Sequence, residues 1–294
     1  MTQACTSVEV VVDERADVGE GPLWDHRAGL LYWVDITPGR LHVFDPGSGS
    51  SWTHEMGQSL GSVALRERGG LIVALRDGLH TLDPDEGRLE PLLEIDSRAP
   101  TLWLNDSACD RAGRLWVDSV SDDEKPGSSC LYRVHPSLKL SKEVEGATLA
   151  NGLGWSPDDR TMYFVDSMAD GISAFDYDLT SGRLSGRRNF VQSEAEQGLP
   201  DGLTVDEEGF VWVAYWGGWC VRRYSPEGTL DRVVELPVSQ VSSCSFGGEN
   251  LDELYITTAA NQLSAEDLSV QPAAGSLFRA RPGVRGLAAS GFGG

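Results

Sequence analysis

The chain has 294 residues, 40% of them hydrophobic, and a formal net charge of -21 at pH 7. This length allows one or two domains, and all-β architectures often exceed 200 residues as a single domain. The negative charge argues against nucleic acid or an anionic membrane surface as a partner, because both need a basic face. No apolar run approaches the roughly 20 residues of a membrane span, so we expect no membrane association.

The N-terminal residues 1–12 show neither the basic region nor the apolar region of a signal peptide. The five cysteines have no paired spacing, which favours reduced thiols over a disulfide framework. They are Cys5, Cys109, Cys130, Cys220 and Cys244. We therefore expect a cytoplasmic protein.

One short motif recurs six times along the chain. In its clearest copies, Glu20-Gly21, Asn151-Gly152 and Asp201-Gly202, an oxygen-bearing side chain and a Gly lead into an apolar segment. All six copies begin at Glu20, Gly61, Asn105, Asn151, Asp201 and Ser242, with spacings of 41, 44, 46, 50 and 41 residues. A repeat of this length that is built from strands is typical of a β-propeller.

The predicted strands follow the motif in a regular order. A turn rich in Asp, Gly and Pro precedes a second strand with an aromatic or large apolar centre, as β-hairpins require. These second strands are expected at 31–34, 70–73, 115–117, 162–165, 211–213 and 254–256. Third strands are expected at 40–45, 78–83, 131–134 and 172–176, and a fourth strand after each following turn. Only residues 263–268 suggest a short helix.

The fold class predicted from this pattern is all-β, a six-bladed β-propeller that forms one domain over residues 1–294. Residues 7–12 read as a β-branched strand ahead of the first repeat, and 275–280 as a strand at the end of the last. Pairing of the N-terminal strand into the last blade would close the ring and remove an open sheet edge.

The motif positions predict a metal site on the propeller axis. The first strand of each blade lines the central channel, so the six motif openings form a circle at one mouth of that channel. Glu20 and Asp201 would bring two carboxylates together, which raises a pKa or requires a counter-cation. Asn105 and Asn151 add amide oxygens. Oxygen donors without thiolate or His are typical of a hard divalent cation.

The sequence favours two other interpretations less. An Asn-Gly or Asp-Gly pair taken singly is more often a turn than a ligand; the occurrence of Asn or an acid at four of six equivalent positions favours the site. A catalytic triad built on His is not expected, because every His falls at a turn or an outer strand. These are His26, His42, His54, His80 and His135.

The same motifs resemble the family of senescence marker protein, gluconolactonases and luciferin-regenerating enzymes. The resemblance covers nearly the whole chain and rests on residues 19–24, 34–36, 151–153, 175–178, 200–202 and 246–248. The run 212–218, Trp-Val-Ala-Tyr-Trp-Gly-Gly, is similar to the bacterial sugar-lactonase branch. The resemblance implies a six-bladed propeller with a divalent cation on its axis.

The resemblance also implies roles for single residues. Glu20, Asn151 and Asp201 fall on the metal-ligand positions, and Asp201 also falls on the general acid/base. Asn105 falls on a residue that contacts the substrate or a water at the metal. The implied activity is hydrolysis of a small-molecule lactone, a sugar lactone by default, with polarisation of the carbonyl by the cation. The oxygen ligands favour calcium, while zinc, manganese and iron(II) stay open.

The chain departs from the family at the substrate positions. Trp103 stands where the family's sugar-lactone enzymes commonly have an Arg. The change from Arg to Trp replaces a charged guanidinium with five hydrogen-bond donors by a flat, mostly apolar ring. Asp123 lies near a second substrate position, and Asp118-Ser119 replaces a usual Gly-Thr pair. If Trp103 contacts the substrate, that substrate is a more apolar or aromatic compound; otherwise Trp103 packs in a loop.

Three functional alternatives therefore stay open for the predicted metal propeller. The first is hydrolysis of a lactone by a monomer or weak homo-oligomer that has only a small molecule as its partner. The second is another reaction on a non-sugar substrate, such as a cyclisation or an isomerisation. The third is a non-catalytic calcium-binding propeller in which the cation is structural.

Overall fold

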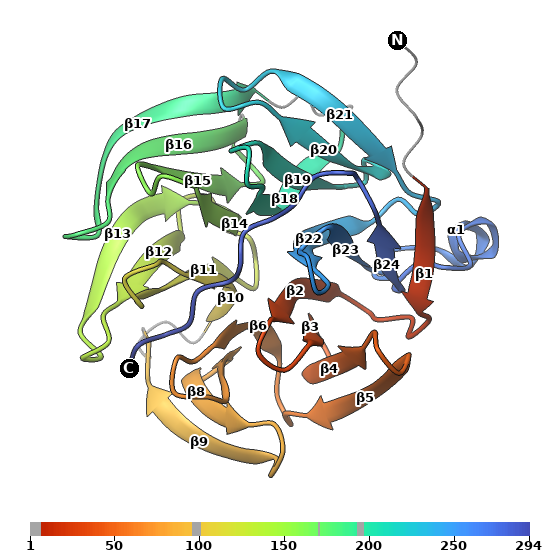
Figure 1. Cartoon of the computed structure of the whole chain (residues 1–294), viewed down its shortest axis with the longest axis horizontal. Coiled ribbons are helices and arrows are strands. Elements are labelled where there is room, and N and C mark those ends of the chain that lie inside the picture. Colours follow the sequence, from red (N-terminus) through yellow and green to blue (C-terminus); the bar gives the residue numbers. More distant parts are fainter. Residues whose placement is uncertain (1–6, 96–100, 170, 193–196) are drawn as a thin grey trace.

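The computed structural model describes residues 7–95, 101–169, 171–192 and 197–294. Its strands form six four-stranded antiparallel sheets arranged as blades around a central axis (Figure 1). The predicted six-bladed β-propeller is therefore confirmed. In blades 1 to 5 the four strands follow one another in chain order from the axis to the rim.

Blade 1 consists of β2 (Gly19–Asp25), β3 (Leu30–Asp35), β4 (Arg40–Asp45) and β5 (Ser50–Glu55). Blade 2 consists of β6 (Leu60–Leu65), β7 (Leu71–Leu75), β8 (Gly78–Asp83) and β9 (Arg88–Leu93). Blade 3 consists of β10 (Leu102–Cys109), β11 (Leu115–Ser121), β12 (Ser129–Val134) and β13 (Leu140–Ala147).

Blade 4 consists of β14 (Ala150–Trp155), β15 (Thr161–Asp166), β16 (Gly171–Asp178) and β17 (Arg183–Gln192). Blade 5 consists of β18 (Leu199–Val205), β19 (Val211–Trp216), β20 (Cys220–Tyr224) and β21 (Leu230–Glu235). Blade 6 consists of β22 (Val241–Gly247), β23 (Glu253–Thr258), β24 (Leu277–Ala280) and β1 (Val8–Val12).

The two ends of the chain meet in blade 6. Strand β1 pairs antiparallel with β24, with Val8 opposite Ala280 and Val10 opposite Phe278. The predicted closure of the ring by the N-terminal strand is thereby confirmed. The predicted helix is present but begins later, as α1 (Ala265–Val270), because Ser264 caps its first turn in a reciprocal hydrogen-bond pair with Asp267. Among the described residues, no helix is both long and apolar enough to span a bilayer.

The hydrophobic core is divided into six clusters, and each cluster lies between two neighbouring blades. The aromatic centres of the second strands fill these interfaces. Trp33, Trp116, Phe164, Trp212 and Tyr255 are all fully buried. Each blade therefore buries its faces against its neighbours, which fixes the positions of the innermost strands around the axis.

Every innermost strand is irregular at the motif position. The pairing register between the first and second strands shifts across Glu20 to Leu23, and equivalent shifts occur in the other five blades. A β-bulge changes the direction in which a side chain points. The bulges explain how a side chain at the start of a strand faces the axis while its neighbours remain in the blade.

The Gly residues after the motif openings allow the innermost strands to approach one another. A Cβ on Gly152 would lie 2.7 Å from the backbone oxygen of Asp201 in the next blade. A Cβ on Gly202 would overlap Ser243 of blade 6, with its Cα only 2.8 Å away. Both Gly lie inside strands, so the turn interpretation of these two pairs is wrong.

Replacement of Gly202 by Ala should destabilise the fold by about 1–3 kcal/mol, because the added methyl group overlaps the Cβ and Cα of Ser243, which a side-chain rotation cannot move away. Urea unfolding monitored by circular dichroism measures this free energy. Gly47→Ala, in the exposed turn between β4 and β5, is the matched control and should change stability little. An equally small effect at Gly202 would show that the strands are not closely packed there.

The far end of the channel is covered by the C-terminal segment 284–294, which we call the strap. It runs as an extended chain across the ends of the innermost strands (Figure 1). Its backbone bonds to several blades: Gly286 donates to Leu251, and Phe292 donates to Leu65. The Phe292 side chain is fully buried in the cluster between blades 2 and 3. The strap therefore joins separate blades at one end of the channel. The motif openings lie at the other end, which the strap does not cover.

Candidate metal centre

Four polar side chains gather at the open end of the channel. Glu20 on β2, Asn105 on β10, Asn151 on β14 and Asp201 on β18 occupy the irregular starts of four innermost strands. Each is only 6–7% exposed. The two remaining openings, Gly61 and Ser242, contribute no carboxyl or amide group. Carboxylate and amide oxygens thus lie together in a water-poor environment.

Hydrogen bonds hold the two amides in place. The Asn105 Nδ2 donates to Asn151 Oδ1 over 2.8 Å and to the Ala150 carbonyl over 2.9 Å. The Asn151 Nδ2 donates to Ser167 Oγ over 2.7 Å, and that hydroxyl donates to the Pro200 carbonyl over 2.6 Å. This chain of bonds runs from blade 3 through blade 4 to blade 5. It orients both amides while their oxygens keep unused acceptor capacity.

The carboxyl groups of the cluster destabilise one another's charged forms. Burial, followed by the charges of Asp201 and Asp106, raises the pKa of Glu20 well above its usual range. Burial and the charge of Asp106 likewise raise the pKa of Asp201. Burial raises the pKa of Asp106 to about 7. Within the described residues, none of these groups forms an ion pair with Lys, Arg or His.

Asp106 and Asp118 belong to this cluster, although the motif reasoning assigned them no role. Asp106 follows Asn105 at the motif position where the clearest copies of the motif have Gly. This acidic residue in place of Gly was the sequence feature that could have indicated its place in the cluster. Asp118, on β11, is fully buried. Its Oδ1 accepts the Asp106 backbone N–H over 3.1 Å, and its Oδ2 has no hydrogen-bond partner within the described ranges. Burial and the charge of Asp106 raise the pKa of Asp118.

Asp118→Asn should stabilise the metal-free protein at pH 8 more than at pH 5. The raised folded-state pKa means that Asp118 favours folding only while it is protonated, and this contribution is lost as pH rises through the folded pKa. Urea unfolding in a chelator at both pH values measures the difference between variant and wild type. Asp123→Asn, in the exposed turn after β11, is the control. If the gain in unfolding free energy from Asp118→Asn did not increase between pH 5 and pH 8, the proposed cost of burying a charged Asp118 would be contradicted.

The residues present fit a hard divalent cation. They offer carboxylate and amide oxygens, and the excess of buried negative charge lacks a protein counter-charge. The unpartnered Oδ2 of Asp118 is one sign of that excess. No preformed cluster of three or more His, Cys, Asp or Glu occurs in the part of the chain that the structure describes. A cation would therefore be held by a mixture of carboxylates and amides.

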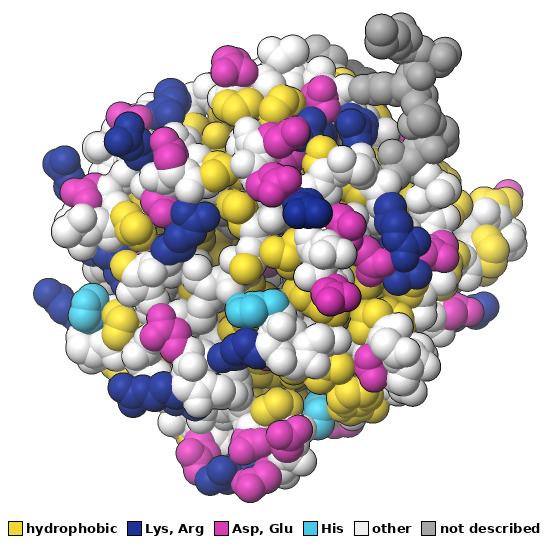
Figure 2. Space-filling model, viewed as in Figure 1, with side chains coloured by type: hydrophobic (Ala, Val, Ile, Leu, Met, Phe, Trp, Pro, Cys, Tyr) yellow, Lys and Arg dark blue, Asp and Glu magenta, His cyan; other side chains and the backbone are white. Residues whose placement is uncertain are grey.

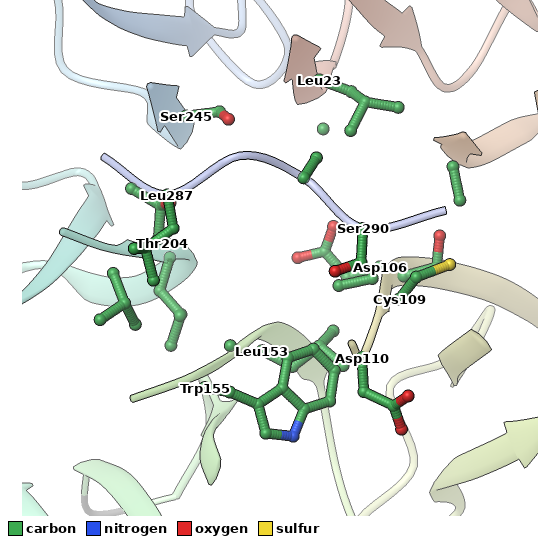
Figure 3. Close-up of a pocket in the computed structure, with 18 of the residues that line it drawn as sticks. Leu23, Asp106, Cys109, Asp110, Leu153, Trp155, Thr204, Ser245, Leu287 and Ser290 are labelled. Carbon is green, nitrogen blue, oxygen red and sulfur yellow. The ribbon is translucent and has the colours of Figure 1, made fainter. Parts of the chain in front are cut away.

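Below this cluster the channel contains a cavity of about 180 Å³. Leu23, Asp106, Leu153 and Thr204, from four different blades, lie around it, and the strap crosses over its far end (Figure 3). Asp106 therefore belongs to the polar cluster and also lines the cavity. On the face of the molecule that carries the strap, acidic and basic side chains are interspersed (Figure 2).

The other two predicted substrate residues, Trp103 and Asp123, are more exposed than this buried group. Trp103 is part of β10, not a loop, and its half-buried side chain packs against the cluster between blades 1 and 2. Asp123 lies exposed in the turn after β11. Its neighbour Asp122 accepts a hydrogen bond from Arg76 over 3.0 Å. The substrate roles of Trp103 and Asp123 stay predictions.

Comparisons with known proteins agree with this geometry. The model of the SMP-30/Gluconolactonase/LRE-like region matches residues 18–260. Regucalcin of Xenopus laevis is 32% identical over 294 residues, which cover 98% of each chain. The Bacillus subtilis protein named "Putative sugar lactone lactonase YvrE" is 34% identical over 270 residues, 92% of each chain.

Among solved structures, a calcium-binding protein, regucalcin from Agrobacterium tumefaciens, superposes with a TM-score of 0.94 at 27% identity. The match covers 98% of this chain and 97% of that one. Matches of this extent include all six blades and every motif opening. The chain therefore belongs to the SMP-30/gluconolactonase/LRE-like family.

Proposed function

We propose that this protein is a divalent-metal-dependent hydrolase that opens a small-molecule lactone. The observation that carries the proposal is the group of Glu20, Asn105, Asn151 and Asp201, which lie nearly buried at the open end of the axial channel without a protein counter-charge. Membership of a family that includes gluconolactonases supports lactones as the substrate class.

Glu20, Asn151 and Asp201 would hold the cation. When bound, a divalent cation polarises a lactone carbonyl and stabilises the negative charge that develops on its oxygen. Calcium is the proposed ion, because the donors are oxygens and because the related Agrobacterium regucalcin is described as a calcium-binding protein. Zinc, manganese and iron(II) remain alternatives for the same donor set.

The remaining steps concern the protein's own groups. The Asp201 carboxylate is proposed to accept the proton of the attacking water and to return it to the ring oxygen as that oxygen leaves. The Asn105 amide, held by Ala150 and Asn151, is proposed to orient the substrate. The surrounding blades limit the access of bulk water to these side chains, which strengthens their electrostatic interactions.

A specific observation supports a second substrate class. At the open end, blades 3 to 5 present apolar side chains: Trp103, Met168, Leu199 and Trp216 are all partly or largely exposed, and Leu199 pairs with Trp216. Such a surface favours an apolar or aromatic lactone over a polyol, because it offers stacking and few hydrogen-bond donors.

A hydrolysis assay with a pH indicator tests the proposal on calcium-loaded protein. The panel runs from aldonolactones to aryl-substituted lactones, and turnover of any member supports lactone hydrolysis. Preference for the aryl lactones, together with its loss in Trp103→Arg, would assign the apolar substrate class. No turnover of any lactone with any of the four ions would refute the proposed function.

A further inference from the structure

A groove of about 630 Å³ lies between blades 4 and 5, outside the axial channel. Phe190 of blade 4 lines it together with Trp219, Leu230 and Val233 of blade 5. Trp219 is 43% exposed, and Leu230 and Val233 are also largely exposed. The volume is that of a small-molecule site, and the lining combines these apolar side chains with polar ones such as Gln192 and Gln197.

A single cationic side chain, Arg222, lies in this groove. Its guanidinium carbon is 4.2 Å from the centre of the Tyr215 ring, and its Nη1 donates to the Gln197 Oε1 over 2.7 Å. Within the described part of the chain, Arg222 forms no ion pair, although Glu235 also lines the groove. An Arg without a carboxylate partner is unexpected on a protein with a net charge of -21.

The aromatic wall of the groove is held in a strained conformation. Trp219 has a φ of +60°, in the left-handed region that bulky residues rarely occupy. At the corresponding place before the third strand, blade 1 has a glycine in positive φ, Gly39. Backbone hydrogen bonds to Ser239 and Leu236 fix the turn. Because Trp219 gains little burial there, packing does not account for its strain.

We propose that this groove is a second binding site, for a small aromatic carboxylate. The aromatic ring of the ligand would lie against Trp219 and Phe190, and its carboxylate would pair with Arg222. The groove combines one cationic group with exposed aromatic and aliphatic side chains, and this combination matches a ligand with one ring and one anionic head. The inference does not depend on the proposed lactonase activity, because none of these residues belongs to the axial cluster.

Calorimetric titration of the full chain with 1-naphthaleneacetate tests the site. We expect saturable binding with one equivalent, and binding weaker by at least about tenfold for the neutral 1-naphthaleneacetamide and for Arg222→Gln. Trp219→Gly should weaken binding by about tenfold without lowering the melting temperature, because Gly fits the turn. Trp52→Ala is the control, since Trp52 is also 43% exposed but lies on β5 of blade 1.

Each outcome decides the proposal. Unchanged affinity in Trp52→Ala and in Asp201→Asn, with loss in the two groove variants, supports a site separate from the axial channel. Equal affinity of the wild type and Arg222→Gln, or of the acid and its amide, overturns it. Absence of binding to the wild type overturns it as well.

Discussion

Asp201→Asn is expected to lower kcat/KM for lactone hydrolysis by about 10³-fold or more, because the change removes both a proposed ligand and the proposed proton acceptor. The side chain is nearly isosteric, so the blades should remain packed. In the metal-free protein the variant should unfold at a higher temperature than the wild type, because one of the mutually repelling buried carboxyls is gone. Initial rates and thermal melts in a chelator measure both effects.

The two readouts separate a site residue from a structural one. Loss of activity with equal or higher metal-free stability supports the assignment of Asp201. Asp85→Asn, in an exposed turn of blade 2, should retain full activity. Full lactonase activity in Asp201→Asn would contradict the proposed centre, and collapse of the fold would contradict the view that this carboxylate destabilises the metal-free protein.

Phe292→Ala should lower the free energy of unfolding by about 3–5 kcal/mol, the usual cost of removing a large buried ring. Phe292 is fully buried between blades 2 and 3 although only two residues follow it in the chain. Its N–H donates to Leu65 over 2.7 Å, and its carbonyl accepts from Glu67 over 3.0 Å. Loss of the ring would therefore loosen the strap at the point where it joins these two blades.

Urea unfolding followed by tryptophan fluorescence measures this effect. Phe292→Leu should cost less, because most of the volume is kept. Val270→Ala on α1 is the exposed control, since Val270 is 71% exposed. A loss below about 1 kcal/mol for Phe292→Ala would show that the strap does not stabilise the ring.

The sequence was sufficient to predict the blades because each repeat is local. Each consists of strands joined by short hairpins, and the turn residues and the aromatic second strands lie within about 40–50 residues of one another. The pairing of β1 with β24 was also predictable, because an unpaired β-branched strand at residues 7–12 needs a partner. The predicted helix was displaced by only two residues because its capping box begins at Ser264.

The strap and the full cluster could not be predicted in this way. Residues 284–294 have no strand pattern, and their position depends on backbone hydrogen bonds to blades that lie far away in sequence. Asp118 lies on a second strand, where an acidic residue would ordinarily face solvent. Only the three-dimensional packing places its carboxyl beside Asp106. The openings themselves were predictable as a set, because the same strand position recurs in each blade.

The most direct test of the central claim is a titration of metal-stripped protein with calcium while lactone hydrolysis is recorded. The axial cluster predicts that activity is absent after chelation and returns in proportion to calcium, with a plateau at one equivalent per chain. The Asp201→Asn variant should show no recovery under the same conditions. Hydrolysis that continues at full rate in the stripped protein would contradict the claim that these carboxylates hold a catalytic cation.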